Sequence, residues 1–355
     1  MNRQPNNIEH TWGILPPYLL EAIKLRGNDK QKAMATTLEK QAQRYRNTRE
    51  EAAPAEPVIA ARILAAAEKP VLQREVYDGG NKAALPGKLA RKEGEAAVKD
   101  TAVNEAYDGA GCVFNLYHEI FQRNSIDGNG MDILSTVHHR RNFNNAFWNG
   151  EQMVYGDGDG MLFNRMTILS IIGHELSHGV VQFSGGLIYR DQSGALNESF
   201  ADVFGSLTEQ YKKKQSITEA SWLIGEGIFG DNINGVALRS LKAPGAAYDD
   251  PLIGKDPQPF HMDDYVSTTA DNGGVHINSG IPNHAFYLLA QYLGGFAWEK
   301  AGQIWYDAMQ AINNPMATFA EWADKTVEMA RNRFGEGSIE VIMTRRAWKL
   351  IGINV

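Results

Sequence analysis

Apolar residues recur with different periods along this chain, and the period changes near residue 71 and again near residue 164. Ahead of the first change, the segment PPYLLEAIKLRGN opens with two prolines and carries Gly27 near its end, which predicts a short helix. A second helix is predicted over residues 31–46. The stretch NTREEAAPAEP, residues 47–57, is rich in charge, alanine and proline and has no apolar period. It predicts an exposed linker after a small helical unit.

From residue 71 onward the pattern is mixed. Short apolar runs bounded by Gly, Asn and Pro predict strands within residues 71–80, 84–95 and 131–163. Between them, apolar residues from Val103 to Phe121 alternate spacings of four and three, which predicts one long helix. After residue 164 nearly every periodic segment is helical, apart from a loop-rich span over 229–275. The pattern therefore predicts an α+β protein, mixed in its first half and helical in its second.

Composition narrows the class of protein. A chain of 355 residues with 43% hydrophobic content can bury a large core, and two domains are expected at this length. The net charge of -7 gives no reason to expect nucleic acid or a membrane as a partner. Cys112 is the only cysteine, so an intrachain disulfide is excluded. The first twenty or so residues carry no recognisable secretory signal, and no apolar run reaches the length of a membrane span.

The segment IIGHELSHGVVQ, residues 171–182, contains candidate chemistry. His174 and His178 are four residues apart, so on a helix both imidazoles can point at one metal ion about 2 Å from each. Glu175 is one step round the helix and can instead reach a water held by that ion. The pattern indicates a metal-assisted hydrolase, whereas the alternative is a hydrogen-bonded histidine pair without metal.

A second segment, NESFADVFG, supplies the missing ligand. Catalytic zinc needs a third protein ligand, and Glu198 can provide it from another predicted helix. Asp202 follows four residues later on the same face and can accept the remaining N–H of a ligand histidine. Taken singly, the two carboxylates would fit a solvated helix face, but after the histidine motif they predict a zinc site.

At these residues the sequence resembles the thermolysin family of neutral zinc metalloproteases. The resemblance covers roughly residues 72–355, where NNAFWNG, MVYGDGDG, GHELSHGV, GLIY, NESFAD and DNGGVHINSGIPN occur in the family's order. The first segment with PPYLL is similar to the short propeptide of the protealysin branch. The resemblance implies a propeptide over 1–52, a β-rich peptidase domain over 53–184 that includes the histidine motif, and a helical domain over 185–355. The active-site cleft is expected between the two domains.

The resemblance also assigns roles to single residues. It implies zinc on His174, His178 and Glu198, and Glu175 as the general base. Asp202 and Asn197 are expected to orient the metal ligands. Tyr189 and His276 are expected to donate hydrogen bonds to the oxyanion. Asp271 is expected to be the carboxylate that orients and charges His276.

Substrate binding is implied in the same way. Asn145 and Ala146 match an edge strand that pairs with extended peptide, and Arg239 matches an arginine that binds the carbonyl of the residue after the scissile bond. The pocket for the side chain of that residue is expected to be apolar and to favour Leu, Phe or Ile; its lining would be Phe163, Ile171, Ile224, Ile228 and Leu238.

One departure concerns calcium. Of the positions that match a paired calcium site in the family, only Glu209 and Glu226 are acidic here, which are too few for two ions. One weakly bound calcium ion, or none, is expected.

The sequence thus predicts a zinc endopeptidase, a monomer that acts on proteins or peptides and is made as a self-processing precursor. Two other classes stay open: a zinc-dependent binding protein without activity, and an exopeptidase. The PPYLL segment either enters the cleft as part of the propeptide or only starts a helix. The family resemblance implies an extracellular enzyme exported without a recognisable signal, with a cytoplasmic pool as the alternative.

Overall fold

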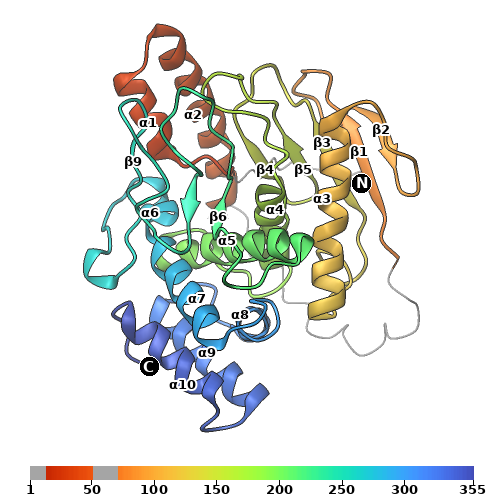
Figure 1. Ribbon diagram of the computed structural model, residues 1–355. Coiled ribbons are helices and arrows are strands. Elements are labelled where there is room, and N and C mark those ends of the chain that lie inside the picture. The colour runs from red at the N-terminus through yellow and green to blue at the C-terminus, as the bar shows by residue number, and fades with distance from the viewer. Residues whose placement is uncertain (1–12, 51–70) are drawn as a thin grey trace, which may run out of the picture.

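The computed structural model describes residues 13–50 and 71–355, with side chains described for 13–40 and 71–355 (Figure 1). A five-stranded sheet lies at one end of the molecule and a group of helices at the other, with two buried helices between them. Among the described residues no helix is long and apolar enough to cross a membrane.

Two helices form the N-terminal unit, as the proline and glycine signals predict. Helix α1 spans Pro17–Arg26 with proline in its first turn, where the missing N–H costs no helical bond. The Gly27 N–H caps the end of α1 through the Ile23 carbonyl, at 2.8 Å. Helix α2 spans Asp29–Glu50. The predicted linker is therefore wrong for residues 47–50, because NTRE contains no proline and continues the helix; residues 51–57 lie outside the described residues.

The sheet confirms the predicted strands. In chain order these are β1 Arg74–Asp78, β2 Lys88–Lys92, β3 Ile133–Val137, β4 Ala146–Trp148 and β5 Met153–Tyr155. The spatial order is β2-β1-β3-β5-β4, parallel for β1 with β3 and for β3 with β5, and antiparallel at both edges. Strand β4 therefore lies at one edge of the sheet. The predicted long helix is α3, Thr101–Asn115, which continues as a π turn over Leu116–Ile120.

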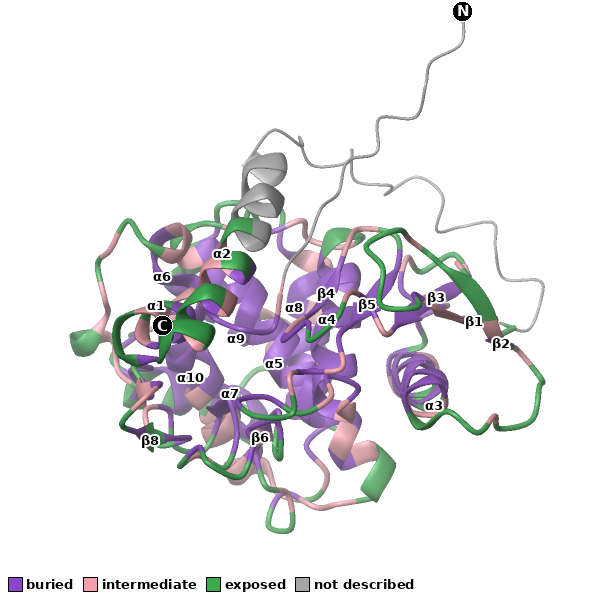
Figure 2. Ribbon diagram, turned by 90° about the horizontal axis from the view of Figure 1, so that it is seen from above, coloured by how far each residue is buried: buried purple, intermediate pink, exposed green. Residues whose placement is uncertain are grey.

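Helices α4 (Leu169–Gln182) and α5 (Asp191–Lys213) occupy the middle of the fold (Figures 1 and 2). Two glycines let their backbones approach closely. A Cβ on Gly205 would lie 2.5 Å from the Ser170 carbonyl oxygen, and one on Gly173 would lie 3.0 Å from the Gly205 Cα. No side chain fits between the two helices at this crossing. The side chains on the facing sides of α4 and α5 therefore lie close to one another.

The C-terminal half is helical, as predicted. Its later helices are α6 Asp271–Asn278, α7 Gly280–Leu293, α8 Ala301–Ala311, α9 Phe319–Phe334 and α10 Ile339–Leu350. The loop-rich span before them also contains a 3₁₀ turn over Met262–Asp264 and short antiparallel pairs: β6 Leu223–Ile224 with β7 Arg239–Ser240, and β8 Asp249–Asp250 with β9 Gly254–Lys255. Strands of only two residues are too short to be predicted from the spacing of apolar residues. The core between α8 and α10 includes parallel stacking of Trp305 on Trp348, with ring centroids 5.6 Å apart.

Candidate metal centre and peptide-binding cleft

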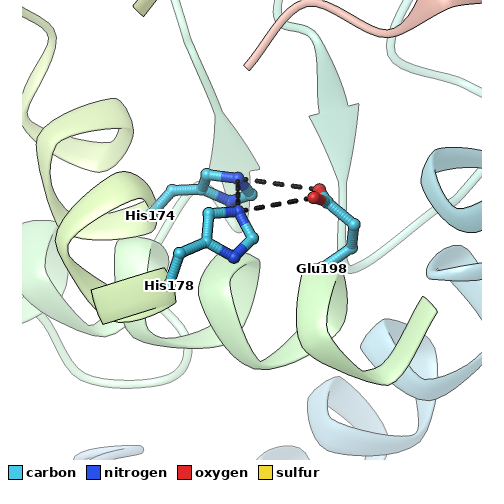
Figure 3. A group of neighbouring side chains, drawn as sticks. All are labelled: His174, His178 and Glu198. Atoms are coloured by element: carbon cyan, nitrogen blue, oxygen red, sulfur yellow. Dashed lines mark hydrogen bonds and ion pairs between the residues drawn. The ribbon is translucent and has the colours of Figure 1, made fainter. Parts of the chain in front are cut away.

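Three side chains converge between α4 and α5 (Figure 3). His174 and His178 come from α4 and Glu198 from α5, and one ligand atom of each lies within 4.8 Å of the other two. The two imidazole Nε2 atoms are 3.0 Å apart, and the Glu198 carboxylate oxygens lie 3.3 Å from His178 Nε2 and 3.6 Å from His174 Nε2. Among the residues whose side chains are described, this is the only such group of three or more His, Cys, Asp or Glu side chains.

The hydrogen bonds behind the rings decide which nitrogen carries the proton. Asn197 uses its amide N–H to donate to the Leu187 carbonyl at 3.1 Å, so its Oδ1 accepts from His178 Nδ1 at 2.8 Å. His174 Nδ1 lies 2.8 Å from the carboxylate of Asp202, which can only accept when ionised. Both Nε2 atoms therefore carry lone pairs that face each other.

This arrangement fits zinc. Two bare nitrogen lone pairs at 3.0 Å repel each other unless a cation lies between them. Tetrahedral zinc, at about 2 Å from each nitrogen, would separate them by roughly 3.3 Å, so only a small adjustment is needed. Glu198 Oε2 is buried without a hydrogen-bond partner and is the remaining ligand atom. The donor set of two histidines and one carboxylate is the set used by catalytic zinc sites that leave a position open.

Burial and neighbouring charges set the ionisation of these groups. Burial lowers the pKa of His174 to about 4, so the imidazole is neutral and available as a ligand. Burial opposes the ionisation of Asp202, but Arg239 and the hydrogen bond from His174 outweigh it and lower the pKa of that carboxyl to about 2. Arg239 donates to Asp202 through Nε and Nη2, each at 2.8 Å, and Asn283 Nδ2 donates at 2.9 Å. Asp202 is thus a fully bonded carboxylate behind His174.

Glu175 lies on the same helix but points elsewhere. Its side chain is fully buried, and Oε2 accepts a hydrogen bond from the Trp148 backbone N–H of β4 at 3.1 Å. The carboxylate is thereby fixed between the metal ligands and the edge strand. Glu175 directly follows the candidate ligand His174 on α4 and contacts β4, so its position would suit a base acting on a peptide bound along that strand.

A second group of polar side chains faces Glu198 from the opposite wall. Tyr189 donates to Glu198 Oε1 and lies 3.1 Å from His276 Nε2. Asp271 holds His276 from behind, 2.7 Å from Nδ1, and accepts the His276 backbone N–H at 3.0 Å. Burial lowers the pKa of His276, but Asp271 and Glu198 raise it more, so the net shift is upward. His276 Nε2 lies 3.6 Å from Glu198 Oε1, on the side of the ring away from Asp271.

The loop that carries His276 has an unusual backbone. Residues 271–274 all have positive φ angles before α6 turns right-handed. Gly273 has φ 88°, and a Cβ there would lie 2.1 Å from an Asp191 carboxylate oxygen. This left-handed turn brings Asp271 back onto the His276 ring.

The predicted peptide-binding residues contact a segment of this same chain. The Ile14 N–H donates to the Ala146 carbonyl at 3.0 Å, and the Leu15 N–H donates to Asn145 Oδ1 at 3.2 Å. Arg239 Nη1 donates to the Ile14 carbonyl at 3.3 Å. The segment thus makes one main-chain bond to β4 at the edge of the sheet, where an added strand would bind.

The five predicted pocket residues are all fully buried, and they lie on neighbouring segments of the fold. Ile224 pairs with Arg239 across β6 and β7, and the Leu238 N–H donates to the Ile224 carbonyl. Gly225 has Leu238 and Ile171 side chains beside it. Phe163 bridges to Phe229, next to Ile228. An apolar region therefore lies directly beside Arg239.

Sequence reasoning missed three contributors. Asn283 supports Asp202 from α7, and a buried asparagine in the otherwise apolar IPNHAFYLL was the available signal. The backbone N–H of Trp148 holds Glu175, and no side-chain pattern marks such a contact. Ile14 had no signal beyond the neighbouring prolines.

The two calcium candidates lie apart from any cluster. Glu209 forms an ion pair with Lys213 on α5, and Glu226 is exposed in a loop. A hollow of about 400 Å³ next to Glu226 is lined by Asp157, Asn164 and Arg165 among others. Calcium binding therefore stays a prediction.

A buried group of two histidines and one glutamate that could hold a metal ion, close to an edge strand that contacts an extended chain segment, indicates a metallopeptidase. The catalytic-domain model of the thermolysin metallopeptidases matches residues 28–182, and the α-helical-domain model of the same family matches residues 185–353. The chain belongs to the thermolysin family of metallopeptidases.

Individual relatives agree with that assignment. An extracellular metalloprotease of Pectobacterium carotovorum subsp. carotovorum is 45% identical over 96% of this chain and 96% of its own length. Thermolysin of Alicyclobacillus acidocaldarius is 40% identical over 78% of this chain and half of its own length. The solved precursor of protealysin, from Serratia proteamaculans, superimposes with a TM-score of 0.86 at 45% identity, covering 96% of this chain and 99% of that one. The N-terminal helices accordingly correspond to a propeptide in a metalloprotease precursor.

Proposed function

We propose that this protein is a zinc-dependent endopeptidase that is made as a self-processing precursor and cuts peptide bonds on the N-terminal side of bulky hydrophobic residues. One observation carries the proposal: the segment Ile14–Leu15 bonds to the Ala146 carbonyl, the Asn145 side chain and Arg239, next to the strand whose Trp148 N–H holds Glu175. Bound peptide and candidate catalytic groups therefore share one cleft.

His174, His178 and Glu198 would hold the zinc ion, with Asn197 and Asp202 fixing the two imidazoles. When bound, zinc supplies a Lewis acid that polarises the peptide carbonyl and acidifies a water molecule. Glu175 accepts a proton from the attacking water and returns it to the leaving nitrogen. Its buried carboxylate, held by the Trp148 N–H, is positioned for both transfers.

The negative charge that develops on the carbonyl oxygen needs fixed donors. Tyr189 O–H and His276 Nε2–H, 3.1 Å apart, supply two of them on the side opposite Glu175. Asp271 keeps His276 oriented and raises the pKa of its imidazole, which favours the protonated donor. Without substrate, Tyr189 donates to Glu198 and His276 Nε2 lies 3.1 Å from the Tyr189 hydroxyl, so both donors exchange these partners for the carbonyl oxygen when substrate binds.

Substrate binding follows the contacts of Ile14. Asn145 and Ala146 hold the peptide backbone, and Arg239 holds the carbonyl of the residue after the scissile bond. The side chain of that residue enters the pocket of Phe163, Ile171, Ile224, Ile228 and Leu238, which offers no charged partner. Leucine, phenylalanine or isoleucine is favoured there because each buries its apolar surface.

The domain limits follow from these assignments. Residues 1–52 form the propeptide, 53–184 the N-terminal peptidase domain and 185–355 the C-terminal helical domain. The propeptide occupies the cleft through Ile14 and Leu15, so the precursor is inhibited until the propeptide is removed. The enzyme removes it by its own activity and works outside the cell as a monomer on protein or peptide substrates, with no paired calcium site.

An internally quenched peptide with both ends blocked tests the proposal against its two rivals. The mature protein, loaded with zinc, should cut a peptide that has Leu after its central bond and should lose this activity when zinc is removed. An exopeptidase would leave the blocked peptide intact, and a binding protein would bind the peptide without cutting it. Either result would refute the endopeptidase.

A further inference from the structure

The residue before Ile14 is Gly13, and it has no room for a side chain. An ideal Cβ placed on Gly13 would lie 2.3 Å from Asn145 Nδ2 and 2.9 Å from Asn145 Cγ. Both separations are shorter than any ordinary contact, so a side chain at residue 13 requires something to shift.

Asn145 is not free to make that shift. Its Oδ1 accepts the Ala146 N–H at 2.9 Å and the Leu15 N–H at 3.2 Å, so the amide group is held from both sides. Turning the amide away would break the bond that holds Leu15. Moving the segment instead would stretch the Ile14 bonds to Ala146 and Arg239. Either way, the segment loses bonds that fix it in the cleft.

We propose that Gly13 is a positioning residue of the precursor: the absence of a side chain there allows the segment to close over Asn145 and occupy the peptide-binding cleft. The inference rests on the proposed role of the cleft in binding peptides, and it concerns how strongly the precursor inhibits itself. Ile14 supplies the apolar contact, while Gly13 supplies the space that lets Ile14 reach its place. A side chain at residue 13 therefore opens the cleft without touching any catalytic group.

The sign of the effect separates this proposal from a general glycine effect. Replacing a glycine with alanine at a position that tolerates a side chain stiffens the unbound segment and strengthens its hold. A clash does the reverse. Overpacking of this kind costs about 1–3 kcal/mol, which weakens an interaction about fivefold or more. Competing peptide should thus bind more tightly to the variant if the clash is real and more weakly if the position has room.

The experiment uses full-length precursor carrying Glu175→Gln, so that the N-terminal segment stays attached, as intact mass verifies. Gly13→Ala, Ile14→Asp and Leu25→Ala are each added to it. Leu25 is 75% exposed on α1 and serves as the control. The probe is an end-blocked fluorescent peptide with Leu after its central bond, and its dissociation constant is measured by anisotropy on zinc-loaded protein. Zinc content and thermal midpoint check that each variant is folded.

Gly13→Ala is expected to lower the apparent dissociation constant of the probe about fivefold or more relative to Leu25→Ala, because the fraction of open cleft rises. Gly13→Ser should behave in the same way. If Ile14→Asp lowers the constant and Gly13→Ala does not, the inference about Gly13 is overturned while occupancy of the cleft stands. If neither variant changes it, the proposed occupancy itself fails.

Discussion

Arg239 and His174 are joined through one carboxylate. Asp202 accepts two hydrogen bonds at 2.8 Å from Arg239 and lies 2.8 Å from His174 Nδ1. The group that holds the Ile14 carbonyl and the group that orients a metal ligand therefore share a fully buried ion pair. The residue that contacts the N-terminal segment and a candidate metal ligand are therefore linked by direct contacts through this pair.

Breaking the pair should be costly. Arg239→Met leaves Asp202 buried without its charged partner, and we expect the free energy of unfolding to fall by about 3–5 kcal/mol. Replacing both residues, Arg239→Met with Asp202→Leu, should cost less than the sum of the single changes, because no charge is left unpaired. Denaturant titration of the three proteins measures this coupling, and simple additivity would contradict it.

Specificity should follow the apolar pocket beside Arg239. Burial of one aliphatic side chain contributes roughly 1.5–3 kcal/mol, which is at least tenfold in rate when expressed in the transition state. Blocked peptides with Leu or Phe after the scissile bond should be cut at least about tenfold faster, in kcat/KM, than those with Asp. Equal kcat/KM values for Leu and Asp would refute the pocket.

Self-processing should leave a defined product. Wild-type protein should shorten on storage to a new N-terminus between Arg46 and Ile59, while Glu175→Ala should keep its full 39.3 kDa with zinc bound. Helix α2 continues through Glu50, so we expect the new N-terminus in the part of this range that follows the helix. Intact mass and N-terminal sequencing decide the outcome. Trimming of Glu175→Ala at the same bond and rate would show that another protease acts.

His138 should make stability depend on pH. Its Nδ1 lies 2.8 Å from Asp157 and its Nε2 lies 2.9 Å from Asp100, the residue that caps α3. Burial lowers the pKa of His138, but the two carboxylates raise it more, so the folded value exceeds the unfolded one. The stabilisation is then complete below the unfolded pKa, about 6.5, and is lost as the pH rises through the folded pKa.

His138→Gln should therefore reduce the free energy of unfolding more at about pH 6 than at about pH 9. Urea titrations of both proteins at the two pH values measure the difference. His118→Gln is the control, since no carboxylate contact is recorded for His118 among the described side chains. A larger loss for His138→Gln at the higher pH would reverse the sign and exclude this explanation.

The sequence predicted the helices and strands whose apolar residues recur at regular spacing. It also predicted that His174, His178 and Glu198 form one metal site. Helical spacing fixes His174 and His178 on one face, whatever the rest of the chain does. The pairing of Glu198 with them depends on the α4 and α5 crossing at Gly173 and Gly205, which no local pattern reveals. Resemblance to a family supplied that contact in advance.

Other features depend on contacts between residues far apart in the sequence, so the sequence pattern could not predict them. The support of Asp202 by Asn283 joins residues 81 positions apart. The contact of Ile14 with Ala146 joins the N-terminal segment to the edge of a sheet. The end of α2 was misplaced because charged residues fit a linker and a helix equally well, and propensity alone continues the helix.

Zinc content and peptidase activity, measured side by side on three variants, test the central claim most directly. His174→Ala and Glu198→Gln each remove a ligand, so zinc occupancy and activity should fall together. Glu175→Gln should keep zinc at the wild-type level and lose activity, because the base is not a ligand. Metal analysis by mass spectrometry and cleavage of the blocked Leu peptide give the two readings. Full activity in metal-free protein, or wild-type activity of Glu175→Gln, would contradict the account.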